Sequence, residues 1–163
     1  MTELVFTNRY ATHPDDVRGY DTEQLRQHFL LDNLMQADSL VLNYTHYERL
    51  IVGSAVPTTQ PLFLPTVDAL KAEYFLERRE LGIINVGADG VVVVDDVTYP
   101  LANKEALYVG RGAKAVWFHS VNPEQPAKFY LNSTPAHRAY PHTHITMAQC
   151  NVLHMGALET SNH

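Results

Sequence analysis

Four consecutive charged residues, Glu77 to Glu80, precede the apolar run LGIINVG. Alternate side chains of an extended strand point to opposite faces, so we expect Glu77 and Arg79 on one face and Arg78 and Glu80 on the other. Buried ions need partners, and one interpretation is ion pairing at a barrel mouth or subunit interface. The other interpretation is a substrate site, in which Arg78 or Arg79 binds a carboxylate through its two-pronged guanidinium and Glu77 or Glu80 orients that arginine.

Histidines are the second group that could do chemistry, and five of the nine follow Asn132. His142 and His144 form the one His-x-His of the chain. On a strand both imidazoles would face the same side and could form part of a metal site. They lack a glutamate and a third histidine at the spacing of a metal-binding barrel, so a solvated loop is the competing interpretation. His137, in PAHRAYP, could lie near a substrate pocket or be a hydrogen-bonded structural histidine.

Composition limits the classes of partner and of compartment. The chain has 163 residues, 45% of them hydrophobic, and a formal net charge of −6. This size fits one domain, and the negative charge argues against nucleic acid or an anionic membrane as the main partner. The single cysteine, Cys150, excludes an intrachain disulfide and is expected to be a buried small residue rather than a nucleophile. The polar N-terminus does not read as a secretory signal, and no apolar run would span a bilayer, so we expect a cytoplasmic protein.

The elements that would position these residues are mostly short strands. One helix is predicted in DTEQLRQHFLLDNL, where Asp21 caps the N-terminus and Gln24 completes a capping box, with Leu25 and Phe29 on an inward face. Short β-rich runs separated by Gly, Pro, Asp and Asn then predict an all-β sandwich or barrel. These runs are LVLNYTHY, RLIVGSAV, EYFLER, LGIINVG, VVVVDD, VTYPL, ALYVG, AVWFHSV and AKFYLN.

Turn chemistry predicts how some of these runs are connected. GADG (residues 87–90) should supply the positive-φ residues of a tight hairpin, and Asp95-Asp96 should reverse VVVV into VTYPL. The tail after residue 132 is interrupted by prolines, and a short helix is predicted from Thr146, with Gln149 as its capping-box partner.

Several of these stretches, in this order, are similar to the first half of the 4-deoxy-L-threo-5-hexosulose-uronate ketol-isomerase family. They are YDTEQLRQHFLLDNL, THYERLIVGSAVP, YFLERRELGIINVG, ALYVGRGAKAVWF and PAKFYLNSTPAHRAYP. The resemblance implies a cupin-type double-stranded β-helix barrel, zinc in a second barrel and a hexameric assembly. It also implies aldose–ketose isomerisation in pectin and uronate breakdown, from 5-dehydro-4-deoxy-D-glucuronate to 3-deoxy-D-glycero-2,5-hexodiulosonate, so the expected ligand is a small uronate-derived sugar acid.

The metal pattern of cupins does not fit this chain when it is laid on the resembling stretches. Glu80 takes the position of the glutamate ligand, but the histidine positions fall near Tyr74, Leu76 and Ala115, which cannot bind zinc. We therefore expect no metal in this chain, and no catalytic residue can be named from it. The candidates for substrate contact are those described above: Glu77, Arg78, Arg79, Glu80 and His137.

The expected organisation has three parts. Residues 1–35 form a helical or extended arm, residues 36–135 a cupin-like β-barrel, and residues 136–163 a linker with a short C-terminal helix that leads toward a second barrel. Two alternatives remain open. The chain could be a non-catalytic assembly or sugar-binding module, or a small metal-binding cupin of oxygenase or epimerase type that uses His142 and His144.

Overall fold

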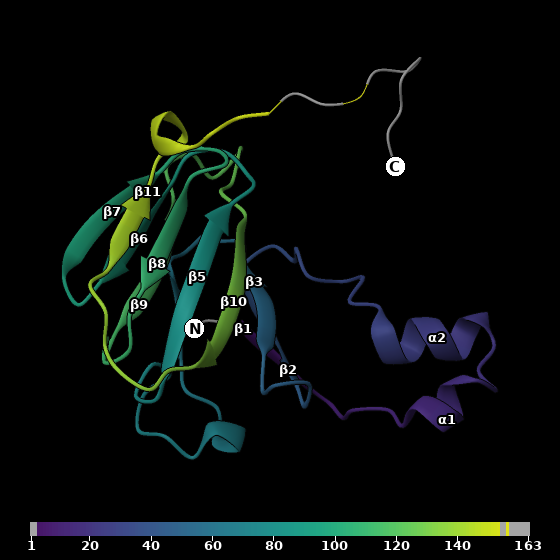
Figure 1. The fold of residues 1–163 in the computed structure, drawn as a ribbon. Helices are drawn as coiled ribbons and strands as arrows, with labels where there is room; N and C mark the ends of the chain where they lie inside the picture. Colours follow the sequence, from purple (N-terminus) through teal and green to yellow (C-terminus); the bar gives the residue numbers. More distant parts are fainter. Residues whose placement is uncertain (1–2, 154–155, 157–163) are drawn as a thin grey trace.

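Two β-sheets form the body of the protein in the computed structural model, which describes residues 3–153 and 156 (Figure 1). The larger sheet has the strand order β1-β2-β3-β10-β5-β8-β11, and the smaller has the order β4-β9-β6-β7. The strands are β1 (Glu3–Arg9), β2 (Ser39–Thr45), β3 (Ile51–Ala55), β4 (Leu62–Phe63), β5 (Arg79–Asn85), β6 (Gly90–Val94), β7 (Val97–Leu101), β8 (Ala106–Val109), β9 (Val116–Ser120), β10 (Phe129–Pro135) and β11 (Thr143–Ile145).

The order of β3 to β10 identifies the fold. These eight strands lie in two four-stranded halves, 3-10-5-8 and 4-9-6-7, and every neighbouring pair is antiparallel. This order is that of two interlocked Greek keys, the jelly roll that cupins share. The prediction of an all-β, cupin-type double-stranded β-helix is therefore confirmed, and we call β3 to β10 the barrel. Strands β1 and β2 extend one edge of the larger sheet, and β11 extends the other.

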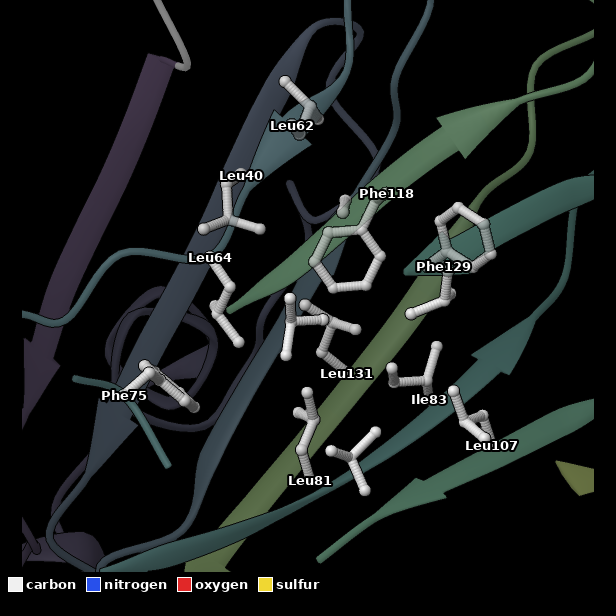
Figure 2. Close-up of a cluster of buried hydrophobic side chains, with 14 of the residues drawn as sticks. Leu40, Leu62, Leu64, Phe75, Leu81, Ile83, Leu107, Phe118, Phe129 and Leu131 are labelled. Carbon is white, nitrogen blue, oxygen red and sulfur yellow. The ribbon is translucent and has the colours of Figure 1, made fainter. Parts of the chain in front are cut away.

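Apolar side chains fill the space between the two sheets. Strand β5 alternates buried and more exposed residues, which directs Leu81 and Ile83 inward from the larger sheet. Phe118 comes from the smaller sheet and meets Phe129 of β10, with ring centroids 5.4 Å apart. Figure 2 shows these side chains pointing toward one another with other buried leucines. The middle of the barrel is thus a packed core.

The helical arm confirms one prediction and corrects another. Helix α1 (Pro14–Val17) is followed by α2 (Thr22–Phe29), which begins with the predicted capping box between Asp21 and Gln24. However, the predicted inward face is wrong, because α2 buries no residue, and Leu25 and Phe29 are 39% and 49% exposed. The reason is visible in Figure 1, where both helices project away from the sheets and no second layer covers α2.

The two predicted turns have different outcomes. Asp95 and Asp96 have φ values of 45° and 69° and join β6 to β7, so the predicted hairpin is confirmed. The predicted GADG hairpin is wrong, since β5 pairs with β8 and β10 whereas β6 pairs with β7 and β9, and this loop crosses between the sheets. Neither glycine of GADG has a positive φ. Gly87 is instead needed for close packing, because a Cβ there would lie 2.3 Å from the Lys128 nitrogen.

Three shorter segments complete the fold. EYFLER was expected to be a strand, but residues 73–78 form bends and turns, with Glu77 N donating to Tyr74 O, and β5 begins only at the next residue. A 3-10 turn, η1 (Asp68–Leu70), precedes them. The predicted C-terminal helix is confirmed as a single 3-10 turn, η2 (Met147–Gln149), in which Gln149 Oε1 accepts from Thr146 N at 2.8 Å. Within the described residues, no helix has the length and apolarity needed to cross a membrane.

Candidate functional site

The two arginines of the charged cluster are held in different ways. Arg79 begins β5 and is only 5% exposed, whereas Arg78 lies in the preceding turn and is exposed. The Nε of Arg79 donates to Ser133 Oγ at 3.1 Å. Its Nη2 donates to the backbone oxygens of Ser133 and Arg49, both at 2.7 Å. The guanidinium also lies 5.9 Å from the ring centroid of Tyr44. Neutral oxygens and an aromatic ring therefore surround this buried cation.

The two glutamates of the cluster contact other groups. Glu77 accepts from the Glu73 amide at 2.7 Å and lies 3.7 Å from Arg78 Nε, so the cluster does contain one ion pair. Glu77 does not share an alternating face with Arg79, because the chain is still turning there. In the part of the chain that the structure describes, neither Glu77 nor Glu80 lies within 4.0 Å of the Arg79 guanidinium.

Glu80 points to the opposite side of β5 from Arg79. Its Oε2 accepts from the Tyr108 hydroxyl at 2.7 Å, and its Oε1 lies 3.5 Å from Thr134 Oγ1. Burial, together with this hydrogen bond to the carboxylate, raises the pKa of Tyr108 to about 12. Tyr108 is thus a stable hydrogen-bond donor at neutral pH.

The Arg79 side chain lines a cavity of about 150 Å³. Two other arginines, Arg49 and Arg78, line the same cavity, together with Tyr44, Leu70 and Phe75. We call it the arginine cavity, and no carboxylate is among its lining residues. It lies at one end of the barrel, where the β2–β3 turn, η1 and the first residue of β5 meet. Arg49 is at that turn, with a φ of 55°, and its side chain is exposed.

The electrostatics of the arginine cavity follow from this lining. Burial lowers the pKa of Arg79 to about 10, and the neighbouring positive charge of Arg49 acts in the same direction while Tyr44 opposes it. At neutral pH the guanidinium is still charged. Among the described residues no carboxylate forms an ion pair with Arg49 or Arg79. The cavity therefore has a positive potential that an anion would relieve.

None of the three candidate histidines is among the residues that line this cavity. His142 Nδ1 accepts from the Gly110 amide at 3.0 Å, and His144 Nε2 lies 3.1 Å from Glu105 Oε2. Both contacts hold β11 against the edge of the larger sheet. His137 is exposed in the loop after β10, and its backbone oxygen accepts from an arginine at 3.1 Å. The structure thus brings Arg78 and Arg79 together with Arg49 in one cavity, which none of the three histidines lines, although His137 follows the lining residue Pro135 by two positions.

The residues of the barrel do not fit zinc. The described residues contain no group of three or more His, Cys, Asp or Glu side chains that could hold a metal ion. At the cupin ligand positions, Leu76 is 1% exposed and Ala115 offers no donor atom. Cys150 was expected to be buried but is exposed, because the chain after β11 leaves the sheet; its Sγ lies 3.4 Å from Thr146 O.

Sequence reasoning missed Arg49 and Tyr44 as members of this site. They lie about thirty residues before the charged cluster, and the hairpin between β2 and β3 brings them to it. The one available signal was the motif THYERL, in which two charged residues separate two β-rich runs and so mark a tight turn.

Solved structures with similar folds include cupins, but the similarity is weak. The Schizosaccharomyces pombe Cnp3 cupin domain has a TM-score of 0.48 and 11% identity, covering 67% of this chain and 73% of that one. An RmlC-like cupin from Desulfovibrio desulfuricans has a TM-score of 0.44 and 19% identity, covering 66% of this chain and 94% of the other. At these scores the comparison adds nothing to the strand order, on which the fold assignment rests.

Curated relatives are much more similar in sequence, although the chain matches no family model. The 4-deoxy-L-threo-5-hexosulose-uronate ketol-isomerase of Formosa agariphila is 57% identical over 158 residues, which is 97% of this chain and 56% of that protein. Enzymes of the same name from Bacteroides fragilis and Lachnoclostridium phytofermentans are 49% and 48% identical over 95% of this chain and 55% and 56% of their own lengths. By sequence the chain is therefore homologous to curated 4-deoxy-L-threo-5-hexosulose-uronate ketol-isomerases, and it spans little more than half the length of these relatives.

Proposed function

We propose that the chain forms one barrel of an aldose–ketose isomerase that converts 5-dehydro-4-deoxy-D-glucuronate to 3-deoxy-D-glycero-2,5-hexodiulosonate. The observation that carries the proposal is the 57% identity to a relative of that name over 97% of the chain. In this organisation residues 36–135 form the cupin-like domain that contains the barrel strands β3 to β10, and residues 136–163 lead toward the rest of the enzyme. The enzyme would act on a uronate-derived sugar acid in the cytoplasm during pectin breakdown, as a homo-oligomer of six copies.

The filled core indicates where the reaction does not take place. Isomerisation at an aldehyde end moves hydrogen between adjacent carbons, which needs an acid–base group beside the reacting carbons and room for them. Phe118 and Phe129 occupy the middle of the barrel and are fully buried. Since the described residues also do not fit zinc, we place the metal and the reacting centre in the part of the enzyme that this chain does not span.

A chimera tests the proposal directly. Residues 1–163 would be joined to the remainder of the Formosa agariphila relative, beginning where its match to this chain ends. Turnover of the 5-keto-4-deoxyuronate by the chimera, with none by the chain alone whether or not zinc is added, is the expected result. The remainder alone serves as the control for activity that does not need this barrel.

Two other outcomes would contradict the proposal. An inert chimera with a folded barrel would favour a non-catalytic assembly or sugar-binding module. Turnover by the chain alone, with one tightly bound metal that His144→Ala removes, would favour the small metal cupin that uses His142 and His144. Elemental analysis of the purified chain separates this last case from contamination by another isomerase.

A further inference from the structure

The guanidinium of Arg79 is buried but incompletely bonded. An arginine has five N–H donors, and three of them are used by Ser133 Oγ and by the backbone oxygens of Ser133 and Arg49. No described residue accepts from Nη1. Nη1 also retains some access to solvent. Among the described residues, the one side-chain nitrogen or oxygen that is both inaccessible and without a partner is Arg9 Nε. Two donors of a buried cation thus face the arginine cavity.

Arg49 adds a second positive charge to the same cavity. Its side chain forms no ion pair with a carboxylate in the described part of the chain, and it lines the cavity together with Arg79. After burial, its positive charge is a further cause of the lowered pKa of Arg79. Arg78 lies at the rim, where Glu77 at 3.7 Å partly balances its charge. Two like charges beside a cavity are relieved by an anion between them. The cavity is therefore built for a negatively charged group.

The size and the walls of the cavity narrow the choice of anion. Its volume of about 150 Å³ is below the roughly 300–1,000 Å³ of pockets that enclose whole small-molecule ligands. It thus suits one end of a ligand. Leu70 and Phe75 provide an apolar wall, which suits a carbon skeleton better than a fully hydrated inorganic ion. A carboxylate also matches the planar guanidinium, which can donate two parallel hydrogen bonds to it.

We propose that the arginine cavity binds the carboxylate of a small organic acid, with Arg79 Nη1 and the Arg49 guanidinium as the donors. The inference deepens the proposed function, on which it rests for the identity of the acid as a uronate-derived sugar acid. This barrel would then hold the charged end of a sugar acid although it does not catalyse its isomerisation.

Calorimetric titration of the purified chain with galacturonate tests the inference, with galactose as the neutral probe and inorganic phosphate as the anion without a carbon skeleton. We expect saturable binding of galacturonate at neutral pH, at least about tenfold tighter than that of galactose or phosphate. Arg49→Gln should weaken it about tenfold, because a charge-assisted hydrogen bond is lost while the backbone oxygen that holds Arg79 remains. Equal affinity for galactose, or equal or tighter binding of phosphate, would overturn the carboxylate assignment.

Two further variants make the test specific. Arg18→Gln removes another exposed arginine, from the helical arm, and should leave the affinity unchanged. Arg79→Lys keeps the charge but loses the fork, so we expect weaker binding, with the fold checked by thermal unfolding. If Arg49→Gln binds galacturonate as tightly as the wild type does, the assignment of the site to the arginine cavity is wrong. The binding measurement does not depend on turnover. An active chimera whose barrel does not bind galacturonate would therefore refute this inference alone. Galacturonate binding together with an inert chimera would refute the proposed isomerase function alone.

Discussion

Replacing Asn85 by alanine should strongly destabilise the protein. Asn85 is fully buried, and its amide makes four hydrogen bonds. Nδ2 donates to Ala88 O at 2.7 Å and to Leu101 O at 2.9 Å, while Oδ1 accepts from Gly87 N at 3.0 Å and Lys128 N at 3.3 Å. One side chain thus ties the crossover after β5 to the end of β7 and to the start of β10. Alanine leaves all four backbone groups without this partner.

The size of the effect follows from the number of bonds. At about 1 kcal/mol for each net hydrogen bond, the variant should lose about 4 kcal/mol of the free energy of unfolding. This is a large part of the roughly 5–15 kcal/mol that stabilises a typical domain. With a urea m-value of about 2 kcal/mol/M, the unfolding midpoint should fall by about 2 M. Urea unfolding followed by the fluorescence of the single tryptophan measures that shift.

Asn103→Ala is the matched control. Asn103 is exposed and makes one side-chain hydrogen bond, from Nδ2 to Gly87 O at 2.6 Å, so its replacement should cost less than about 1 kcal/mol. A midpoint for Asn85→Ala within about 0.5 M of this control would refute the reasoning, because the four bonds would then contribute no more than one exposed bond.

Three other predictions follow from the edge of the larger sheet. Gly110→Ala places a Cβ 2.0 Å from the Tyr140 oxygen, so the segment before β11 should move and amide exchange in β11 should rise about tenfold; unchanged exchange would contradict the packing. A backbone hydrogen bond and nearby His144 lower the pKa of Glu105. Its stabilising effect is thus present above its unfolded pKa and lost as pH falls through its lower folded pKa; equal acid-unfolding midpoints for the wild type and Glu105→Gln would exclude this effect. Ultraviolet titration should show Tyr108 ionising near pH 12, and its persistence in Tyr108→Phe would assign that ionisation to another tyrosine.

Structure that depends on neighbouring residues was predictable from the sequence. The capping box of Asp21 and Gln24, the 3-10 turn at Thr146 and the hairpin at Asp95-Asp96 all involve groups within four residues of one another. The β-rich runs between Gly, Pro, Asp and Asn likewise predicted most strands of the barrel, because strand propensity and turn chemistry are properties of short segments. Such patterns also sufficed to predict the fold class.

Structure that depends on the partner of a strand was not predictable in this way. The loop GADG has the composition of a hairpin, yet it crosses between sheets, because β5 finds its partners in β8 and β10. The apolar face of α2 predicted burial, but periodicity does not indicate whether any surface covers the helix. In both cases the residues specify local geometry, and long-range packing decides what it contacts.

The charged cluster was recognised as a candidate site, but its members could not be sorted from the sequence. We applied strand alternation from Glu77 onward, but β5 begins at Arg79. The alternating pattern therefore does not apply to Glu77 and Arg78. The contribution of Arg49 depends on a turn thirty residues away. Distinguishing the buried arginine from the exposed one required the register of β5 against β10.

That register also makes the arginine cavity a property of the sheet. Arg79 lies opposite Pro135 in β10, and Ser133 lies opposite both Leu81 of β5 and Ile51 of β3. The two acceptors of the guanidinium on Ser133 are thus placed by paired strands, and the Arg49 oxygen by the turn that enters β3 two residues later. A slip of one residue would direct Arg79 to the outer face of the sheet. Because its side chain is anchored on paired strands while Nη1 remains free, the cavity can hold this donor in place before any anion arrives, and binding then has only the exposed Arg49 side chain to order.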